Sequence, residues 1–391
     1  MTRKMKVITA VLVSLLSIVA VWVALHLHPT PSLLETVSID LSPADFDHLN
    51  QKVEDAHELG YYKKGDDEYV PAQITYRSHF SDGKVRLKGD WLDHFSANKW
   101  SFRIKQSKAL ASGIKSYSIQ NPKARGFIDG WVFQQLMRQE GVIANEFRFV
   151  QLKLNQQNWG IYSFEEHLSQ RMIDEQAGAN GIILKFKDDG FFKADIEKQP
   201  TDGLIKEAEI KVYGKLKDDP DFQDDIRFAK KLMRAYQLQV DSVYDYFDAE
   251  KMGAYYALCD LNSAYHAMGW INIRFFYNFE TKLLEPIAYD PYPLLEWGKP
   301  YLGANVDKVN NDPFETTMIV YNALKHPKIR AAYDRKIKVY SDQQFVSNFL
   351  NSHQEQIQFY ETELKKEYPD YQYDYSFLKE NAKNIKTALE K

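Results

Sequence analysis

The N-terminus of the chain carries a basic head followed by a long, almost unbroken apolar run. Arg3, Lys4 and Lys6 precede residues 7–27, which are nearly all hydrophobic. About 20 apolar residues, at 1.5 Å of rise per residue, cross a bilayer core of about 30 Å. Because basic residues stay on the cytoplasmic side, we expect residues 1–28 to form a cytoplasmic head and a single-pass transmembrane anchor. The bulk of the chain would then lie on the extracytoplasmic side of a bacterial cytoplasmic membrane.

A cleaved signal peptide is the alternative interpretation of this run. The apolar region of a signal peptide is usually about 7–15 residues long and ends at a small-x-small site. The run here is longer and ends in the bulky segment 22–26. Both interpretations send the remaining residues, 29–391, to the same side of the membrane.

Composition excludes several classes of protein and of site. The chain has 391 residues, a net charge of -4 and a single cysteine, Cys259. An intramolecular disulfide and a cysteine-based zinc site are therefore excluded, and no basic patch marks a nucleic-acid binder. The aromatic fraction of 14% fits either an aromatic core or a surface on which sugars stack.

Hydrophobic periodicity predicts strands and helices mixed in the first half and mostly helices in the last part. This pattern predicts an α+β class with two lobes, a strand-rich one at about 35–190 and a helical one at about 200–391. Residues 187–224 are charged and poorly periodic, so we expect loops there. The predicted strands are 37–41, 70–76, 83–87, 99–105, 147–154, 160–164, 181–186, 272–277 and 283–288. The predicted helices are one that opens at Ser42 and Pro43, then 129–139, 165–177, 225–238, 251–265 and several after residue 312.

Basic residues alternate along two of the predicted strands, in the segments 85–94 and 99–105. Alternate positions share one face of a strand, so Arg103 and Lys105 would contribute to a cationic face suited to phosphate or sulfate. A solvated face with surface ion pairs is the alternative. No G-x-G-x-x-G, Walker, G-x-S-x-G or H-E-x-x-H motif is present. The sequence therefore gives no motif support for a glycine-rich phosphate loop, a serine hydrolase or a zinc protease.

Carboxylates and an amide follow at three further places. Glu166 stands where a helix is predicted to begin, and it would either pair with a basic residue on a facing strand or complement the helix dipole. Asn272 begins one strand of the predicted hairpin and Asp290 follows the next strand. Their oxygens suit Mg²⁺ held on phosphates, although a turn asparagine and a strand-end aspartate would read the same way.

The order of these segments resembles the CotH kinase family, named after a spore coat protein. In that family R-x-x-G precedes K-x-S-x-R-[IL]-K, a helix with an Arg, a strand ending in L-x-x-N-G, and G-V-Y with a Glu six residues after the Gly. Then come a G-x-L-Y-K strand, D-x-x-x-x-N-N before a Tyr-containing strand, and P-W-D-L-D. The corresponding positions here are 86–89, 99–105, Arg125, 152–155, 160–162 with Glu166, 181–185, 272–277 and 288–290.

The resemblance implies an atypical kinase-like domain that uses ATP with Mg²⁺ or Mn²⁺. It implies phosphate contacts by Arg103, Lys105 or Lys185, and an orienting role for Glu166 opposite one of these lysines. Asp290 and Asn272 would hold the metal in the same cleft between the lobes.

A protein or envelope polymer would be the phosphate acceptor. Near the place of the family's catalytic Asp this chain has His266 and Ala267, so His266 is the candidate base. An inactive kinase-like scaffold or binding protein of the cell envelope, or of exopolysaccharide assembly, is the other interpretation.

Overall fold

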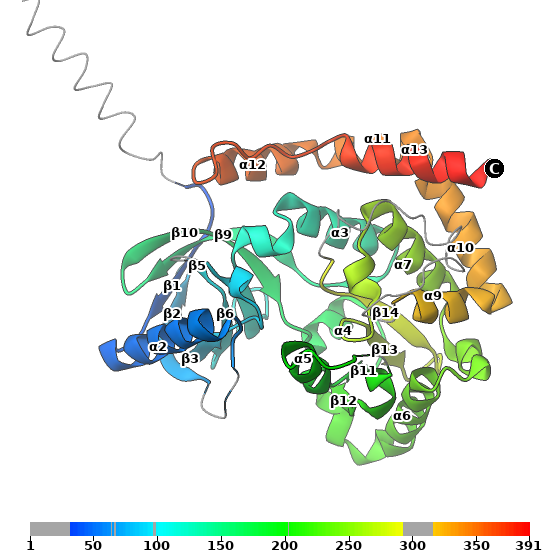
Figure 1. Ribbon diagram of the computed structural model, residues 1–391, viewed down its shortest axis with the longest axis horizontal. Helices are drawn as coiled ribbons and strands as arrows, with labels where there is room; N and C mark the ends of the chain where they lie inside the picture. The colour runs from blue at the N-terminus through cyan, green and yellow to red at the C-terminus, as the bar shows by residue number, and fades with distance from the viewer. Residues whose placement is uncertain (1–31, 64, 66–67, 97–98, 202, 292–315) are drawn as a thin grey trace, which may run out of the picture.

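The computed structural model describes residues 32–63, 65, 68–96, 99–201, 203–291 and 316–391 (Figure 1). The predicted anchor at 7–27 lies outside these residues. Within the described ranges, no helix is both long enough and apolar enough to cross a membrane. The mixed α+β class predicted from the sequence is confirmed.

The first structural unit is a closed barrel of seven strands with its own hydrophobic core. Every neighbouring pair is antiparallel except the parallel pair of the first and last strands. In order around the barrel the strands are β1 (Thr36–Asp40), β2 (Val70–Tyr76), β3 (His79–Leu87), β6 (Phe102–Gln106), β7 (Ser116–Gln120), β10 (Gln157–Glu166) and β9 (Phe147–Leu154). A short ribbon of β4 (Phe95–Ser96) and β5 (Lys99–Trp100) adjoins it.

Helix α2 (Pro43–Leu59) packs on this barrel through Leu49 and Val53. The Ser42 side chain accepts a hydrogen bond from the Asp45 backbone N–H (3.1 Å), and Pro43 occupies the first turn. This is the predicted helix start, and it follows from proline's missing N–H and the capping hydroxyl.

The second unit is a five-stranded sheet enclosed by helices. Its strand order is β12 (Ile210–Tyr213), β11 (Gly181–Phe186), β13 (Arg274–Asn278), β14 (Leu284–Ala288) and β8 (Ile143–Ala144). Strands β8 and β11 lie within the residue range expected for the strand-rich lobe, yet they belong to this second sheet. The reason is that β11 pairs with the distant strand β13, a partner that sequence spacing does not reveal.

Ten α-helices of the described chain accompany the sheet and the loops beside it. They are α3 (Ile128–Gln139), α4 (Gln170–Gln176), α5 (Asp189–Ile196), α6 (Gln223–Gln237), α7 (Ala249–Asn262), α9 (Thr316–Lys325), α10 (Pro327–Tyr340), α11 (Gln343–Ser352), α12 (Gln354–Lys365) and α13 (Phe377–Leu389). Short 3₁₀ helices are η1 (Leu92–His94), η2 (Pro122–Arg125), η3 (Leu204–Glu207), η4 (Lys215–Asp218), η5 (Pro220–Phe222), η6 (Asp241–Tyr246) and η7 (Tyr265–Met268).

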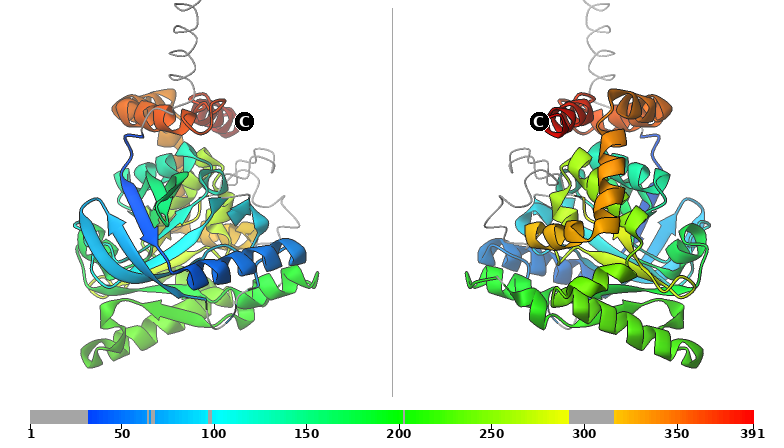
Figure 2. Two further views of the ribbon diagram at one scale, coloured as in Figure 1. Left: turned by 90° about the vertical axis from the view of Figure 1, so that its left-hand side faces the viewer. Right: turned by 90° about the vertical axis from the view of Figure 1, so that its right-hand side faces the viewer.

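The helices α11, α12 and α13 lie together at one end of the molecule (Figure 2). The first described residues reach the same end, because Glu363 of α12 accepts hydrogen bonds from the Ser32 hydroxyl and the Leu33 N–H, both at 2.8 Å. The Glu363 side chain is buried, so this contact joins the start of the domain firmly to its C-terminal part.

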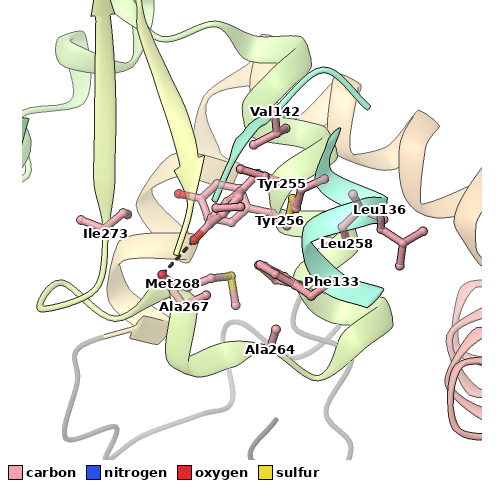
Figure 3. Packing of buried hydrophobic residues seen from close by; sticks show 14 of the residues in the cluster. Phe133, Leu136, Val142, Tyr255, Tyr256, Leu258, Ala264, Ala267, Met268 and Ile273 are labelled. Atoms are coloured by element: carbon pink, nitrogen blue, oxygen red, sulfur yellow. Dashed lines mark hydrogen bonds between the residues drawn. The ribbon is translucent and has the colours of Figure 1, made fainter. Parts of the chain in front are cut away.

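Helix α7 is buried along nearly its whole length and forms the centre of the larger core. Figure 3 shows it packed against Phe133 and Leu136 of α3. The Tyr255 hydroxyl donates to the backbone carbonyl of Ala267 (2.8 Å). The core therefore holds the short helix η7 in place, and η7 carries His266.

The predicted bounds of β2, β9 and β11 are exact. Two other predictions are wrong. The helix expected from residue 165 begins at Gln170, after the N-cap Ser169, because β10 continues to Glu166. The segment 187–224, expected to be loops, contains α5 and the strand β12, because tertiary pairing with β11 stabilises a segment with little periodicity of its own.

Candidate functional site

A cavity of about 650 Å³ lies between the barrel and the five-stranded sheet. Both units contribute charged side chains to its wall. Six of the seven site residues expected from the sequence line it, namely Arg103, Lys105, Lys185, His266, Asn272 and Asp290. The structure thus brings together residues that lie up to 187 positions apart in the chain, while Glu166 is not among the lining residues.

A buried polar network lies in the wall of this cavity on the barrel side. Lys88, just after β3, donates to Gln120 (2.8 Å) and lies 3.4 Å from a carboxylate oxygen of Glu165. Arg125, at the end of η2, donates to the same Gln120 oxygen (2.9 Å) and to Asp290 (2.5 Å). Hydrogen bonds and ion pairs therefore run continuously from a barrel strand to the loop after β14.

The environment of Lys88 lowers the pKa of its ammonium to about 7. Burial is the largest cause, because it disfavours the charged form. The negative charge of Glu165 opposes this effect, and the positive charges of Arg125 and Arg103 add to it. For Glu165 itself, burial would raise the pKa, but Lys88 and Arg125 outweigh it and the pKa is lowered.

The Asp290 carboxylate is an anion at neutral pH. Burial would raise its pKa, yet the neighbouring basic groups Arg125, His266 and Lys88 together lower it to about 2. Asp290 also has a left-handed backbone conformation, with φ at 47°, which aspartate adopts more readily than most residues. This turn directly after β14 puts its side chain against Arg125.

Glu166 does not make the predicted contact with Lys105 or Lys185. It is buried on the other side of β10, where Arg171 donates to it (2.9 Å) and so does the Ser169 hydroxyl (3.0 Å). The contact with a cavity cation belongs to its neighbour Glu165. The physical reason is that successive side chains of a strand point to opposite faces, and β10 extends through both glutamates.

Sequence reasoning did not single out Lys88 or Glu165. Both stood inside segments that attracted attention, but their pairing joins β3 to β10 and depends on the barrel closing. Arg125 was noted only as a position of the family pattern. The sequence did offer one sign of this ion pair: Lys88 stands directly before Gly89, and the adjacent Glu165 and Glu166 stand at the end of a strand.

His266 links the two candidate metal ligands. The Asn272 amide nitrogen donates to the His266 backbone carbonyl (3.0 Å) and lies 3.1 Å from its Nδ1. The same Nδ1 is 3.8 Å from the Asp290 carboxylate. Asn272 and Asp290 therefore both lie close to Nδ1 of one imidazole at the cavity wall, and the Asn272 amide oxygen takes no part in these contacts.

Three basic residues lie side by side on three adjacent strands of the five-stranded sheet. Lys185 of β11 is directly opposite Arg274 of β13 on one side and Lys211 of β12 on the other. All three line the cavity. Burial and the Arg274 charge lower the pKa of Lys185 to about 8, although Asp188 lies 3.5 Å away. Like charges in directly opposite positions destabilise a sheet, so this row favours an anionic ligand.

The basic residues of the barrel complete the cationic wall. Arg103 is buried and donates to the Ser118 hydroxyl (2.9 Å). The Lys105 ammonium lies 4.8 Å from the centre of the Tyr69 ring, within the range of a cation–π contact. The alternating basic face predicted for this strand therefore points into the cavity.

The donor set at the cavity fits a magnesium or manganese ion held jointly with phosphate oxygens. Asp290 supplies an ionised carboxylate and Asn272 an amide oxygen, both hard ligands. In the described part of the chain, no three His, Cys, Asp or Glu side chains form a group able to hold a metal ion by themselves. Magnesium in nucleotide sites commonly uses one or two carboxylates together with substrate phosphates.

Comparison with known proteins gives a family for the chain but no curated relative. No curated protein matches the chain. The family model described as CotH kinase protein matches residues 85–391, which include all of the candidate site residues and most of the chain. The chain therefore belongs to the CotH kinase family.

Proposed function

We propose that this protein is an atypical kinase that transfers a phosphoryl group from ATP to a hydroxyl of a protein or envelope polymer. The observation that carries the proposal is the cavity itself. A network containing an ionised Asp290 and a cationic row of Arg274, Lys185 and Lys211 both line it. In this proposal the barrel and the sheet unit act as the two lobes of a kinase-like domain.

Phosphoryl transfer depends on positioning and on neutralising charge more than on covalent chemistry. The cationic row and the barrel residues Arg103 and Lys105 would bind the phosphates of the nucleotide. Lys88 would also contact them from the barrel side, oriented by Glu165 as a kinase lysine is oriented by its glutamate. Glu165 replaces Glu166 in this role.

Asp290 and Asn272 would hold Mg²⁺ or Mn²⁺. When bound, the ion would supply positive charge to the phosphate oxygens. Arg125 engages one carboxylate oxygen of Asp290. Arg125 thus keeps this carboxylate ionised and oriented toward the cavity.

His266 is the proposed general base. In the transfer, the acceptor oxygen would bond to the γ-phosphorus while the bond from that phosphorus to the β,γ-bridging oxygen breaks. The electron pair of the broken bond would leave with ADP, and the acceptor's proton would pass to the imidazole. The hydrogen bonds of Asn272 and the fixing of Ala267 by Tyr255 hold this side chain at the cavity wall. Histidine is the side chain that most often serves in general acid–base catalysis.

An inactive kinase-like scaffold or binding protein of the cell envelope, or of exopolysaccharide assembly, is the second candidate. The observation that favours it is His266 and Ala267 near the place of the family's catalytic aspartate. For either function, we propose that residues 7–27 anchor the protein in the cytoplasmic membrane and that the domain works outside it.

Nucleotide binding and transfer test the proposal in the purified full-length protein. ATP with Mg²⁺ at about 100 times its dissociation constant stabilises a protein by about 2.7 kcal/mol, which appears as a raised melting temperature. We expect this shift in the wild type and its loss in Asp290→Asn, which removes the charge and keeps the side-chain size. The exposed Asp224→Asn is the matched control, and its shift should equal that of the wild type.

Transfer to bulk envelope protein, followed with labelled ATP, separates the two candidates. A melting shift with transfer supports the kinase. A shift without transfer supports the scaffold, and the absence of any shift at millimolar nucleotide refutes the kinase and also favours the scaffold.

A further inference from the structure

The strand β12 is the edge of the five-stranded sheet, and its outer side is open. Among the described residues, β11 is the only strand paired with it. The Lys187 N–H donates to the Glu209 carbonyl (2.7 Å), which places Lys211 and Tyr213 in the hydrogen-bonded pairs with β11, since these pairs alternate along an antiparallel ladder. The backbone N–H and C=O of Ile210 and Val212 therefore point away from β11.

No hydrogen bond described for this part of the chain uses those outward groups. A groove of about 460 Å³ runs along the strand instead, lined by all five consecutive residues 209–213. A groove above one face would be lined only by alternate residues, so this one follows the strand edge. Its other side is formed by η4 and the first turns of α6.

The side chains of β12 connect this edge to the catalytic cavity. Lys211 and Tyr213 line both the cavity and the groove. Ile210 and Val212 point to the opposite face, where they pack on the main core. A strand added about 4.8 Å beyond β12 would therefore send the side chains level with Lys211 toward the cavity side.

We propose that β12 is the docking site of the phosphate acceptor, which binds as an extended polypeptide that adds an antiparallel strand to this edge. This inference rests on the proposed kinase function. The occupant is a segment with hydroxyl side chains at alternate positions, because those positions project toward the site of transfer. An acidic character suits it, since the groove has three lysines (Lys211, Lys217 and Lys230) against two carboxylates (Glu209 and Asp218).

Strand addition uses backbone hydrogen bonds for affinity and alternate side chains for specificity. The antiparallel direction continues the pattern of β13, β11 and β12. In that arrangement, acceptor residues opposite Ile210 and Val212 form the hydrogen bonds to β12. The residues between them, opposite Lys211, carry the hydroxyls and direct their own N–H groups away from the protein.

The test uses the full-length protein and a fluorescein-labelled nine-residue peptide of alternating threonine and valine with glutamates at both ends. Binding is measured by fluorescence anisotropy without nucleotide. Methylation of the valine backbone nitrogens should abolish binding up to 1 mM peptide, whereas methylation of the threonine nitrogens should leave it within threefold. Equal effects of the two modifications, the reverse order, or no binding of the parent peptide would overturn the proposal.

A variant of the protein tests the same backbone hydrogen bonds between peptide and β12 by removing a donor on β12. Val212→Pro removes one outward N–H without removing a bond to β11, and proline is tolerated on edge strands in this position. Loss of one backbone hydrogen bond should weaken peptide binding about tenfold, while Val212→Thr, which keeps the N–H, should bind like the wild type. Equal affinity of all three proteins would overturn the docking site.

The nucleotide melting shift, measured on the same samples, distinguishes a failure of the docking site from a failure of the kinase function. Peptide binding with the predicted methylation pattern and no nucleotide shift supports the docking edge and refutes the kinase. A nucleotide shift and phosphate transfer to peptide that are indifferent to valine methylation refute the docking edge and leave the kinase in place.

Discussion

Replacing Lys88 by methionine should change how the stability of this protein depends on pH. Lys88 is 8% exposed, and its ammonium is placed among Glu165, Arg125 and Gln120. Methionine has a similar length and no charge. After the substitution, Glu165 still accepts hydrogen bonds from Gln120 (2.6 Å) and Asn145 (3.1 Å) and still lies near Arg125. Its buried carboxylate therefore keeps polar and charged partners.

The expected magnitude follows from the lowered pKa. An unfolded lysine keeps its proton up to about pH 10.5, whereas folded Lys88 releases it above about pH 7. Between these values the unfolded state binds more protons, so stability rises with pH across this window. At about 1.4 kcal/mol for each pH unit, this group alone raises the free energy of unfolding by about 3 to 4 kcal/mol between pH 7 and pH 10.

Urea denaturation at pH 7, 8, 9 and 10 measures the effect, because other titrating groups cancel between the two proteins. Between pH 7 and pH 10, the free energy of unfolding of the wild type should increase by about 3 to 4 kcal/mol relative to that of Lys88→Met. Lys153→Met, at an exposed position on the barrel strand β9, is the control and should follow the wild type. If the difference between wild type and Lys88→Met stays constant within 1 kcal/mol, Lys88 does not titrate in this window and the argument fails.

Three further predictions concern the base, the contact between the barrel and the C-terminal part, and the topology. His266→Ala should lower the rate of phosphate transfer about 10²–10⁴-fold with ATP affinity unchanged in a melting-shift titration; a rate close to wild type would exclude the base role. Gly160→Ala should destabilise the fold by about 1 to 3 kcal/mol more than Gly141→Ala in thermal denaturation. Both glycines have positive φ, but only at position 160 would a Cβ displace the Glu367 carboxylate. That carboxylate accepts from the Ile161 N–H (2.6 Å) and pairs with Lys99 (2.6 Å), so equal losses would refute the displacement. A reporter fused after Lys391 should be active only outside the cytoplasmic membrane, and activity confined to the cytoplasm would contradict the predicted anchor.

Local pattern was sufficient for the elements whose residues alternate strictly. In β2, the buried positions Val70, Ala72, Ile74 and Tyr76 follow a period of two, and the predicted bounds are exact. The start of α2 was equally readable, since a capping serine and a proline act within one turn. The order of short motifs also indicated the family, because motif order is a property of the chain itself.

The mistaken strand end at β10 shows where local pattern fails. Glu165 and Glu166 read as the first turn of a helix, but pairing with β7 and β9 extends the strand through both. Which of two adjacent carboxylates faces the cavity depends on that pairing. The candidate site was therefore one residue wrong at this position, although Arg103, Lys105, Lys185, Asn272 and Asp290 were all brought to the cavity.

By itself, the sequence determined the class of elements and the set of basic and acidic side chains from which a site is built. It also excluded an intramolecular disulfide and a cysteine-based zinc site. Tertiary structure alone decided which of these side chains meet. The pairing of Lys88 with Glu165 requires the barrel to close, and the ion pair of Arg125 with Asp290 joins residues 165 positions apart. The edge of β12 is open because β12 is the last strand of the sheet and pairs with β11 on one side only. Such contacts depend on long-range strand order and burial, and neither is encoded within the few residues that a local pattern spans.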